Sequence, residues 1–165
     1  MTTPLLEGLP PLVDDHARVL ILGSFPSAQS LAAGQYYANP RNAFWPITSE
    51  LFDFDATASY DRRLAALRSH GVALWDVVHK CRRIGSADSA INPKSLLVNN
   101  VSELLADYPT ITRVYFNGAK AADLYRRLAH PAERIAPLQY QRLPSTSPAH
   151  VMRPGAKLAE WRAIL

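Results

Sequence analysis

The segment Gln35–Trp45 gathers the side chains with the clearest chemical potential in this sequence. It contains four aromatic rings, one arginine and the side-chain amides of Asn39 and Asn42. Aromatic rings can stack on an extruded nucleobase, and an asparagine can orient a water molecule or read a base edge. A helix N-terminus with a buried aromatic face is the alternative interpretation, which suits Phe44 and Trp45. Two neighbouring amides are costly to bury without partners, so Asn39 and Asn42 are the stronger functional candidates.

Two further loops carry residue types that suit the binding of anions or bases. Gly23–Ser27 follows a short apolar run, its glycine permits close backbone approach, and its amides could hold an anion or a base carbonyl. Leu143–His150 places three hydroxyl side chains between two prolines, and hydroxyl groups can contact phosphates. An ordinary turn is the alternative interpretation for each loop. Neither loop establishes a function alone.

Strands and helices must bring these segments together. Apolar runs predict strands at Arg18–Gly23, Gly71–Val78, Arg113–Phe116 and Tyr140–Leu143. Helices are predicted at Arg41–Phe54, Ser59–Ser69, Leu96–Tyr108, Asn117–Leu128 and Gly155–Leu165. Residues 79–94 show little periodicity and are expected to form a long functional loop. The alternation predicts an α/β fold with a mainly parallel sheet, in which ligands bind beyond the carboxyl ends of the strands.

Composition restricts the class of protein. A chain of 165 residues suffices for one domain with a hydrophobic core, and we expect a single domain over residues 1–165. The net charge of +4 favours approach to polyanions, although the cations are spread along the chain. Cys81 is the only cysteine, so no internal disulfide can form, and no cysteine–histidine set indicates zinc. No membrane span or secretory signal is visible, so a cytoplasmic location is expected.

Six motifs occur in series along nearly the whole chain. They are Gly23–Pro26, Tyr36–Trp45, Leu74–Val78, Gly85–Ile91, Phe116–Gly118 and Leu143–Ala149. In combination they resemble the uracil-DNA glycosylase superfamily, and in particular its hypoxanthine-DNA (deoxyinosine) glycosylase branch. Each motif is weak alone, and the ordered series makes the resemblance strong.

The resemblance implies a three-layer α/β/α sandwich around a four-stranded, mainly parallel sheet. It also implies a DNA repair glycosylase that hydrolyses the N-glycosidic bond of a deaminated base and leaves an abasic site. Hypoxanthine is the expected base, while uracil, xanthine and ethenoadenine stay open. The implied partner is double-stranded DNA, and a monomer without metal or organic cofactor is expected. Because the motifs offer no lysine as a Schiff-base nucleophile, the enzyme should be monofunctional.

Two departures from the superfamily pattern shape the expected chemistry. Many members place an Asp or Asn in the first loop, where this chain has Phe25, and the best-known uracil enzymes begin the last loop with His, where it has Leu143. By analogy with the hypoxanthine branch, Asn42 is the first catalytic candidate and Asn39 the alternative. An amide is a weak base, so it would orient water for a dissociative reaction. Both departures argue against efficient uracil-specific catalysis.

The remaining candidate residues are assigned to the base and to the DNA backbone. Base-binding candidates are Gly23, Ser24, Phe25, Pro26, Ser27, Tyr37, Phe44 and Asn117, with Phe25, Tyr37 and Phe44 expected to stack on the base. DNA-binding candidates are Ser145, Thr146, Ser147, His150, Arg82 and Arg83. Asp88 is expected to make structural hydrogen bonds rather than to act in catalysis.

Two other function classes fit parts of the sequence. Ser24 could be the nucleophile of a serine hydrolase, with His79 or His150 and Asp76 or Asp88 completing a triad. Against this hypothesis, Gly23–Ser27 lacks the Gly-x-Ser-x-Gly pattern of a nucleophile elbow. The absence of a first-loop carboxylate also leaves open a non-catalytic nucleic-acid-binding domain.

Overall fold

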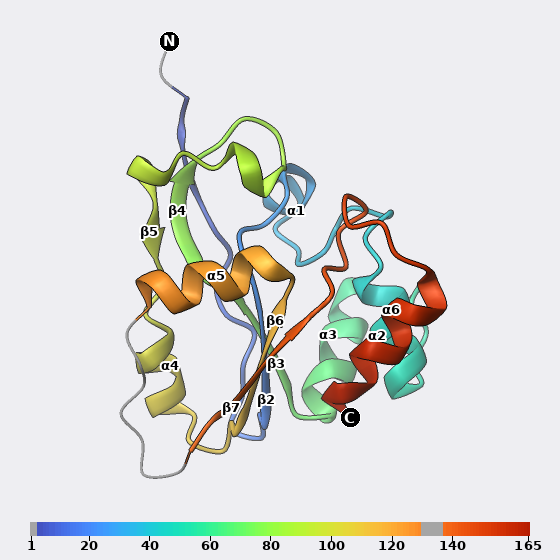
Figure 1. The fold of residues 1–165 in the computed structure, drawn as a ribbon. Helices are drawn as coiled ribbons and strands as arrows, with labels where there is room; N and C mark the ends of the chain where they lie inside the picture. Colours follow the sequence, from blue (N-terminus) through green and yellow to red (C-terminus); the bar gives the residue numbers. More distant parts are fainter. Residues whose placement is uncertain (1–2, 130–136) are drawn as a thin grey trace.

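A four-stranded parallel sheet forms the centre of the protein (Figure 1). The computed structural model describes residues 3–129 and 137–165. The strand order is β3-β2-β6-β7, and all three neighbouring pairs are parallel. The strands are β2 (Val19–Gly23), β3 (Val72–Asp76), β6 (Arg113–Asn117) and β7 (Gln139–Leu143). Four strands were predicted at these places, and the mainly parallel sheet is confirmed.

Helices cover both faces of this sheet, as Figure 1 shows. The helices are α1 (Ala28–Ala33), α2 (Phe44–Phe52), α3 (Tyr60–Ser69), α4 (Val101–Asp107), α5 (Ala119–Leu128) and α6 (Pro154–Trp161). Along β2, Leu20 and Leu22 join the core under α4 and α5, whereas Val19 and Ile21 join the core under α2, α3 and α6. Successive strand residues point to opposite faces, so a continuous apolar run serves both cores. The three-layer α/β/α sandwich is confirmed.

A second, antiparallel sheet corrects the expected loop at residues 79–94. Its order is β1-β4-β5, formed by Leu5–Glu7, Val78–Arg82 and Leu97–Val98. The predicted strand Gly71–Val78 is therefore split, because Val77 leaves β3 and donates its N–H to the carbonyl of Gly23 at 2.9 Å. Pairing with the N-terminal segment is non-local, so the polar residues of β4 gave no local signal. Single 3-10 turns lie at Asp88–Ala90, Pro93–Ser95 and Arg162–Ile164.

Capping side chains explain where two helices differ from the predicted boundaries. The helix expected at Leu96–Tyr108 begins only at Val101, because Asn100 accepts the N–H of Glu103 at 3.1 Å. The unpredicted α1 begins after Ser27, whose hydroxyl accepts the N–H of Ser30 at 3.1 Å. Such caps satisfy the free N–H groups of the first turn. Within the described residues, no helix has the length and apolarity needed to cross a membrane.

The ring of Phe44 belongs to the hydrophobic core. Its side chain is 0% exposed, and its ring lies 4.0 Å from that of Tyr37 and 6.1 Å from that of Trp161, centroid to centroid. The expectation that Phe44 stacks on a base is therefore wrong for this structure, and its interpretation as a core residue is right. Phe44 instead stacks against the ring of Tyr37.

Truncation of Phe44 tests this structural role. We expect Phe44→Ala to lower the free energy of unfolding by about 3–5 kcal/mol, because it leaves a cavity in a closed core. Phe52→Ala is the control, since Phe52 is only partly buried at the end of the same helix. Urea denaturation of both variants measures the difference, and equal losses would show that Phe44 is not a core ring.

Candidate active site

A cavity of about 550 Å³ opens at the carboxyl ends of β2, β3 and β6. Its wall includes most of the residues predicted from the sequence, namely Gly23, Ser24, Phe25, Pro26, Ser27, Tyr37, Asn39, Asn42, Asn117, Ser145, Thr146, Ser147 and His150. It also includes Ser30, Tyr36, Asp76, Ser86, Ala87, Asp88, Ser89, Pro148 and Ala149. Segments distant in the sequence thus meet where parallel strands end, which is the usual ligand position in such sheets.

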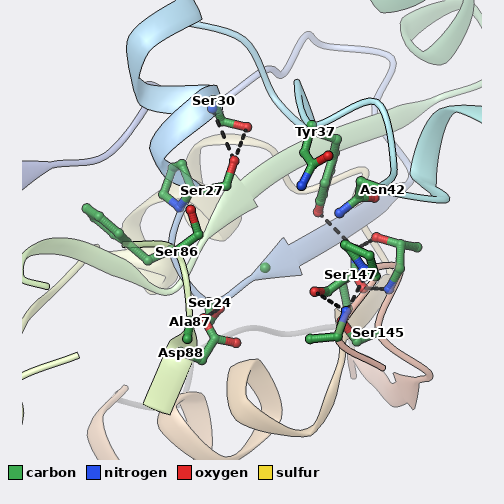
Figure 2. Close-up of a pocket in the computed structure, with 18 of the residues that line it drawn as sticks. Ser24, Ser27, Ser30, Tyr37, Asn42, Ser86, Ala87, Asp88, Ser145 and Ser147 are labelled. Atoms are coloured by element: carbon green, nitrogen blue, oxygen red, sulfur yellow. Dashed lines mark hydrogen bonds between the residues drawn. The ribbon is translucent and has the colours of Figure 1, made fainter. Parts of the chain in front are cut away.

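The side chain of Asn42 is held by the start of α2 and faces this cavity (Figure 2). Its Oδ1 accepts the backbone N–H of Phe44 at 2.9 Å, which fixes the orientation of the amide. No hydrogen bond from its Nδ2 is found among the described residues, so this group can donate toward a base or a water molecule. Asn39 also lines the cavity, and its Oδ1 accepts the N–H of Arg41 at 2.9 Å in a more exposed setting.

Tyr37 and Asn117 form a polar network behind Asn42. Asn117 is 9% exposed, and its Nδ2 donates to the hydroxyl of Tyr37 at 3.2 Å and to Oγ1 of Thr146 at 2.9 Å. Its Oδ1 accepts the N–H of Thr146 at 2.9 Å. Tyr37 has a φ of 54°, a left-handed conformation that is uncommon for a bulky residue. Asn117 therefore positions its neighbours, and Thr146, which is 1% exposed, is too buried for the expected phosphate contact.

The last loop presents Ser145, Ser147 and His150 at the cavity. The hydroxyl of Ser145 accepts the N–H of Ser147 at 3.1 Å, and the hydroxyl of Ser147 accepts that of Ala149 at 3.2 Å. His150 is exposed, and its carbonyl accepts a hydrogen bond from the buried Lys157 of α6 at 3.0 Å. These contacts fix the loop while leaving hydroxyl groups at the surface of the cavity.

Residues 86–88 close the opposite side of the cavity. Ser24, Ser86 and Asp88 lie together on this side (Figure 2). The hydroxyl of Ser24 donates to Oδ1 of Asp88 at 2.7 Å, and Oγ of Ser86 accepts the N–H of Ala28 at 2.9 Å. The structural role expected for Asp88 agrees with this geometry. In the described structure Ser24 donates to a carboxylate and not to a histidine, which is the wrong arrangement for a Ser–His–Asp nucleophile.

Arg83 and Arg82 do not line the cavity, although both were expected to contact DNA phosphates. Arg83 is 4% exposed, and it donates to the carbonyls of Gly85 at 2.8 Å and Pro26 at 2.7 Å. Its guanidinium also lies 5.1 Å from the ring centre of Phe25, so it joins the first loop to the segment after β4. Arg82 lies on β4 and donates to the carbonyl of Thr3. The structure therefore corrects the expectation that these arginines contact phosphates.

Asp76 is the prominent site residue that the base-binding assignment missed. It ends β3, is 5% exposed, and its Oδ2 has no hydrogen-bond partner among the described residues. A Cβ atom at Gly23 would lie 2.4 Å from Oδ1 of Asp76, so any other residue at this position would displace the carboxyl group from its present place. Burial and the nearby Asp88 raise the pKa of Asp76 to about 7, against the opposing effect of Arg83. Its position at a strand end was the available signal.

No group of three or more His, Cys, Asp or Glu residues in the described ranges is arranged to hold a metal ion. The polar side chains that line the cavity instead carry hydroxyls, amides, two carboxyl groups and the imidazole of His150. Such a set can hydrogen-bond to a flat heterocycle and orient water. Together with the strand-end position, this chemistry defines a small-molecule or base-binding pocket on a parallel α/β sheet.

This chain belongs to the uracil DNA glycosylase superfamily, because the family model matches residues 10–164. It is 32% identical over 159 residues to a hypoxanthine DNA glycosylase of Methanosarcina acetivorans, covering 96% of each chain. It is 35% identical over 118 residues to a hypoxanthine DNA glycosylase of Methanosarcina barkeri, covering 71% of this chain and 73% of that one. The solution structure of a putative uracil DNA glycosylase from Methanosarcina acetivorans has a TM-score of 0.80 at 30% identity, covering 98% and 96% of the two chains.

The raised pKa of Asp76 predicts a pH dependence of stability. The folded state holds this proton more tightly than the unfolded state, whose ordinary aspartate pKa is about 4. Raising the pH from about 4 to about 7 therefore costs the folded state up to about 4 kcal/mol at this residue. We expect Asp76→Asn to be more stable than the unmodified protein at pH 8, with the gap shrinking toward pH 4. Urea titrations across this range measure the gap, and a constant difference would contradict the assignment.

Proposed function

We propose that this protein is a monofunctional DNA glycosylase that removes hypoxanthine from double-stranded DNA and leaves an abasic site. The observation that carries the proposal is the fixed amide of Asn42 in a cavity where the strand-end loops meet. The relatives named hypoxanthine DNA glycosylase match most of the chain and support this substrate. We further infer that it acts as a monomer, since the recognition of one base needs no symmetry. We also infer that it acts in the cytoplasm, together with its DNA substrate.

The base must enter the cavity by leaving the duplex. Extrusion costs a few kcal/mol, and this cost is smaller for a mispaired base such as hypoxanthine. The cavity volume of about 550 Å³ falls in the range that is usual for small-molecule sites, so it suits a single base. Phe25 and Tyr37 line it and supply aromatic surface for the extruded base. Phe44 and Arg83 act indirectly, by packing against Tyr37 and Phe25 respectively.

Cleavage of the N-glycosidic bond builds positive charge on the sugar and negative charge on the departing base. Groups aimed at those charges lower the barrier. The oxygen O6 of hypoxanthine shares the negative charge, so hydrogen-bond donors in the first loop can stabilise it. Asn42 orients the attacking water through its amide, and a weak nucleophile suffices because the sugar cation forms first. Asn39, on the same wall, is the alternative residue for this role.

The DNA backbone is held at the mouth of the cavity. Ser145, Ser147 and His150 lie there, and within the described residues the hydroxyls of Ser145 and Ser147 accept only short-range backbone hydrogen bonds. Hydroxyl groups commonly contact phosphate oxygens and set the register of a protein on DNA. Thr146 instead holds the loop, because it bonds to Asn117.

Loss of the Asn42 amide tests the proposed catalytic centre. We expect Asn42→Ala to lower inosine excision by about 100- to 1,000-fold, since removal of one well-placed hydrogen-bonding group typically has this effect. Asn39→Ala is the matched comparison on the same wall and should retain much more activity. The assay uses end-labelled duplexes with one inosine or one uracil, EDTA, and hot alkali to reveal abasic sites.

Each alternative gives a different outcome in this assay or in a separate binding or labelling experiment. Strand cleavage without alkali would contradict a monofunctional enzyme, and preferential cleavage at uracil would replace the proposed base. A larger loss of inosine excision in Asn39→Ala than in Asn42→Ala would assign the catalytic role to Asn39. DNA binding without cleavage would favour a non-catalytic domain, and labelling of Ser24 by a fluorophosphonate would favour a serine hydrolase.

A further inference from the structure

The wall of the cavity offers carboxyl groups but no direct cation to a departing base. Asp76 and Asp88 line it, and within the described ranges no lysine or arginine does so. The imidazole of His150 also lines it, but this side chain is exposed on the last loop. A carboxylate repels a base that is becoming negative, which raises the barrier to cleavage. A positive charge behind the wall would offset this repulsion.

The guanidinium of Arg83 lies directly behind the first loop. It is 5.1 Å from the ring centre of Phe25, and its Nη2 donates to the carbonyl of Pro26 at 2.7 Å. Both of these residues line the cavity, whereas Arg83 does not. Its Nε donates to the carbonyl of Gly85 at 2.8 Å, which fixes the plane of the guanidinium. Because arginine keeps its charge in proteins, a fixed cation lies behind this wall.

This buried cation has no carboxylate as a direct partner. Arg83 is 4% exposed and its Nη1 has no hydrogen-bond partner, and no carboxylate lies at salt-bridge distance from it within the described ranges. Burial lowers the pKa of Arg83, against the opposing effects of Cys81, Asp88 and Asp76. Buried charges are normally paired, because burial removes their hydration. The charge of Arg83 can therefore act on an anion that forms in the cavity.

One peptide group connects this guanidinium to the cavity. The carbonyl of Pro26 accepts the hydrogen bond from Arg83, and the N–H of the same peptide belongs to Ser27, which lines the cavity. Among the described residues, that N–H donates to no other group. Hydrogen bonds in a chain polarise one another, so a cation on the carbonyl makes the N–H a stronger donor. The charge can thus act through space and through this peptide.

We propose that Arg83 is a positioning residue that stabilises the negative charge of the departing base through the first loop. This inference rests on the proposed glycosylase function and concerns its bond-breaking step. The C1′–N9 bond breaks with both electrons on the base, and water adds to C1′. The proton of that water passes to solvent, and solvent protonates the base. A fixed charge in a water-poor site stabilises such a developing charge without rearranging during the reaction.

Two leaving bases of nearly equal shape test this role. Single-turnover excision at saturating enzyme is measured on duplexes that contain one inosine or one 8-azainosine. The added ring nitrogen withdraws electrons, so 8-azahypoxanthine carries negative charge more readily and depends less on outside stabilisation. We expect Arg83→Met to lower inosine excision by about 10- to 100-fold, the usual effect of losing a hydrogen bond to a charged group. Excision of 8-azainosine should fall much less, so the ratio of 8-azainosine to inosine excision should rise.

Three further variants separate the charge of Arg83 from its structural contacts. Arg83→Lys keeps the charge and should restore much of the inosine rate and of the unmodified ratio. Asp88→Asn removes an opposing charge but keeps an oxygen that can accept the Ser24 hydroxyl, so it should lower the ratio. Arg82→Met removes the adjacent cation, which bonds to the carbonyl of Thr3, and should leave the ratio unchanged. Urea unfolding curves identify the folded variants.

The results distinguish a failure of this inference from a failure of the proposed function. Equal losses on both substrates in Arg83→Met would indicate a structural role alone and would overturn the inference. If Arg83→Met does not fold, the ratio in Asp88→Asn decides, and an unchanged ratio there overturns the inference as well. An unmodified protein that excises neither base would overturn the proposed function and this inference with it.

Discussion

The buried amide of Asn117 is the interaction on which the geometry of the cavity depends. It ends a central strand and hydrogen-bonds to Tyr37 and to both the N–H and the hydroxyl of Thr146. The carbonyl of Thr146 in turn accepts the N–H of Ala43, immediately before α2. One side chain therefore ties the sheet to two segments that lie far apart in the sequence. Through it, the segment that carries Asn42 and the last loop share an anchor at the end of β6.

The opposite wall is organised by charge instead of neutral amides. Asp88 raises and Arg83 lowers the pKa of the buried Asp76, and burial lowers the pKa of Arg83 against the opposing effect of these carboxyl groups. Arg83 donates to loop carbonyls through Nε and Nη2, whereas its Nη1 and Oδ2 of Asp76 are both buried without a hydrogen-bond partner among the described residues. An unpaired buried carboxyl group costs stability, and such costs are commonly concentrated at functional sites. Tyr37 on the facing wall has a left-handed backbone conformation, which is a second local cost in stability.

These two walls suit a reaction that needs placement more than acid–base strength. The first loop contributes Phe25 where many relatives of the superfamily place a carboxylate or amide. A dissociative cleavage can proceed without a carboxylate or amide at this position, because the departing base and the sugar share the developing charge. In the proposed reaction the protein has to extrude the right base, hold it flat and admit one water molecule. The hydrogen bonds around Asn42, Asn117 and Thr146 suit that purpose.

The sequence by itself determined the layers of the fold and the strand-end loops that meet, because apolar periodicity and turn residues are local signals. Tertiary structure decided which side chains reach the cavity. Phe44, Thr146 and Arg83 have the residue types of ligand-binding groups, yet packing buries all three. The polar strand Val78–Arg82 became visible only through its pairing with the N-terminal segment. Asp76 gained its unusual environment from Gly23 on a neighbouring strand, a contact that no local pattern could reveal.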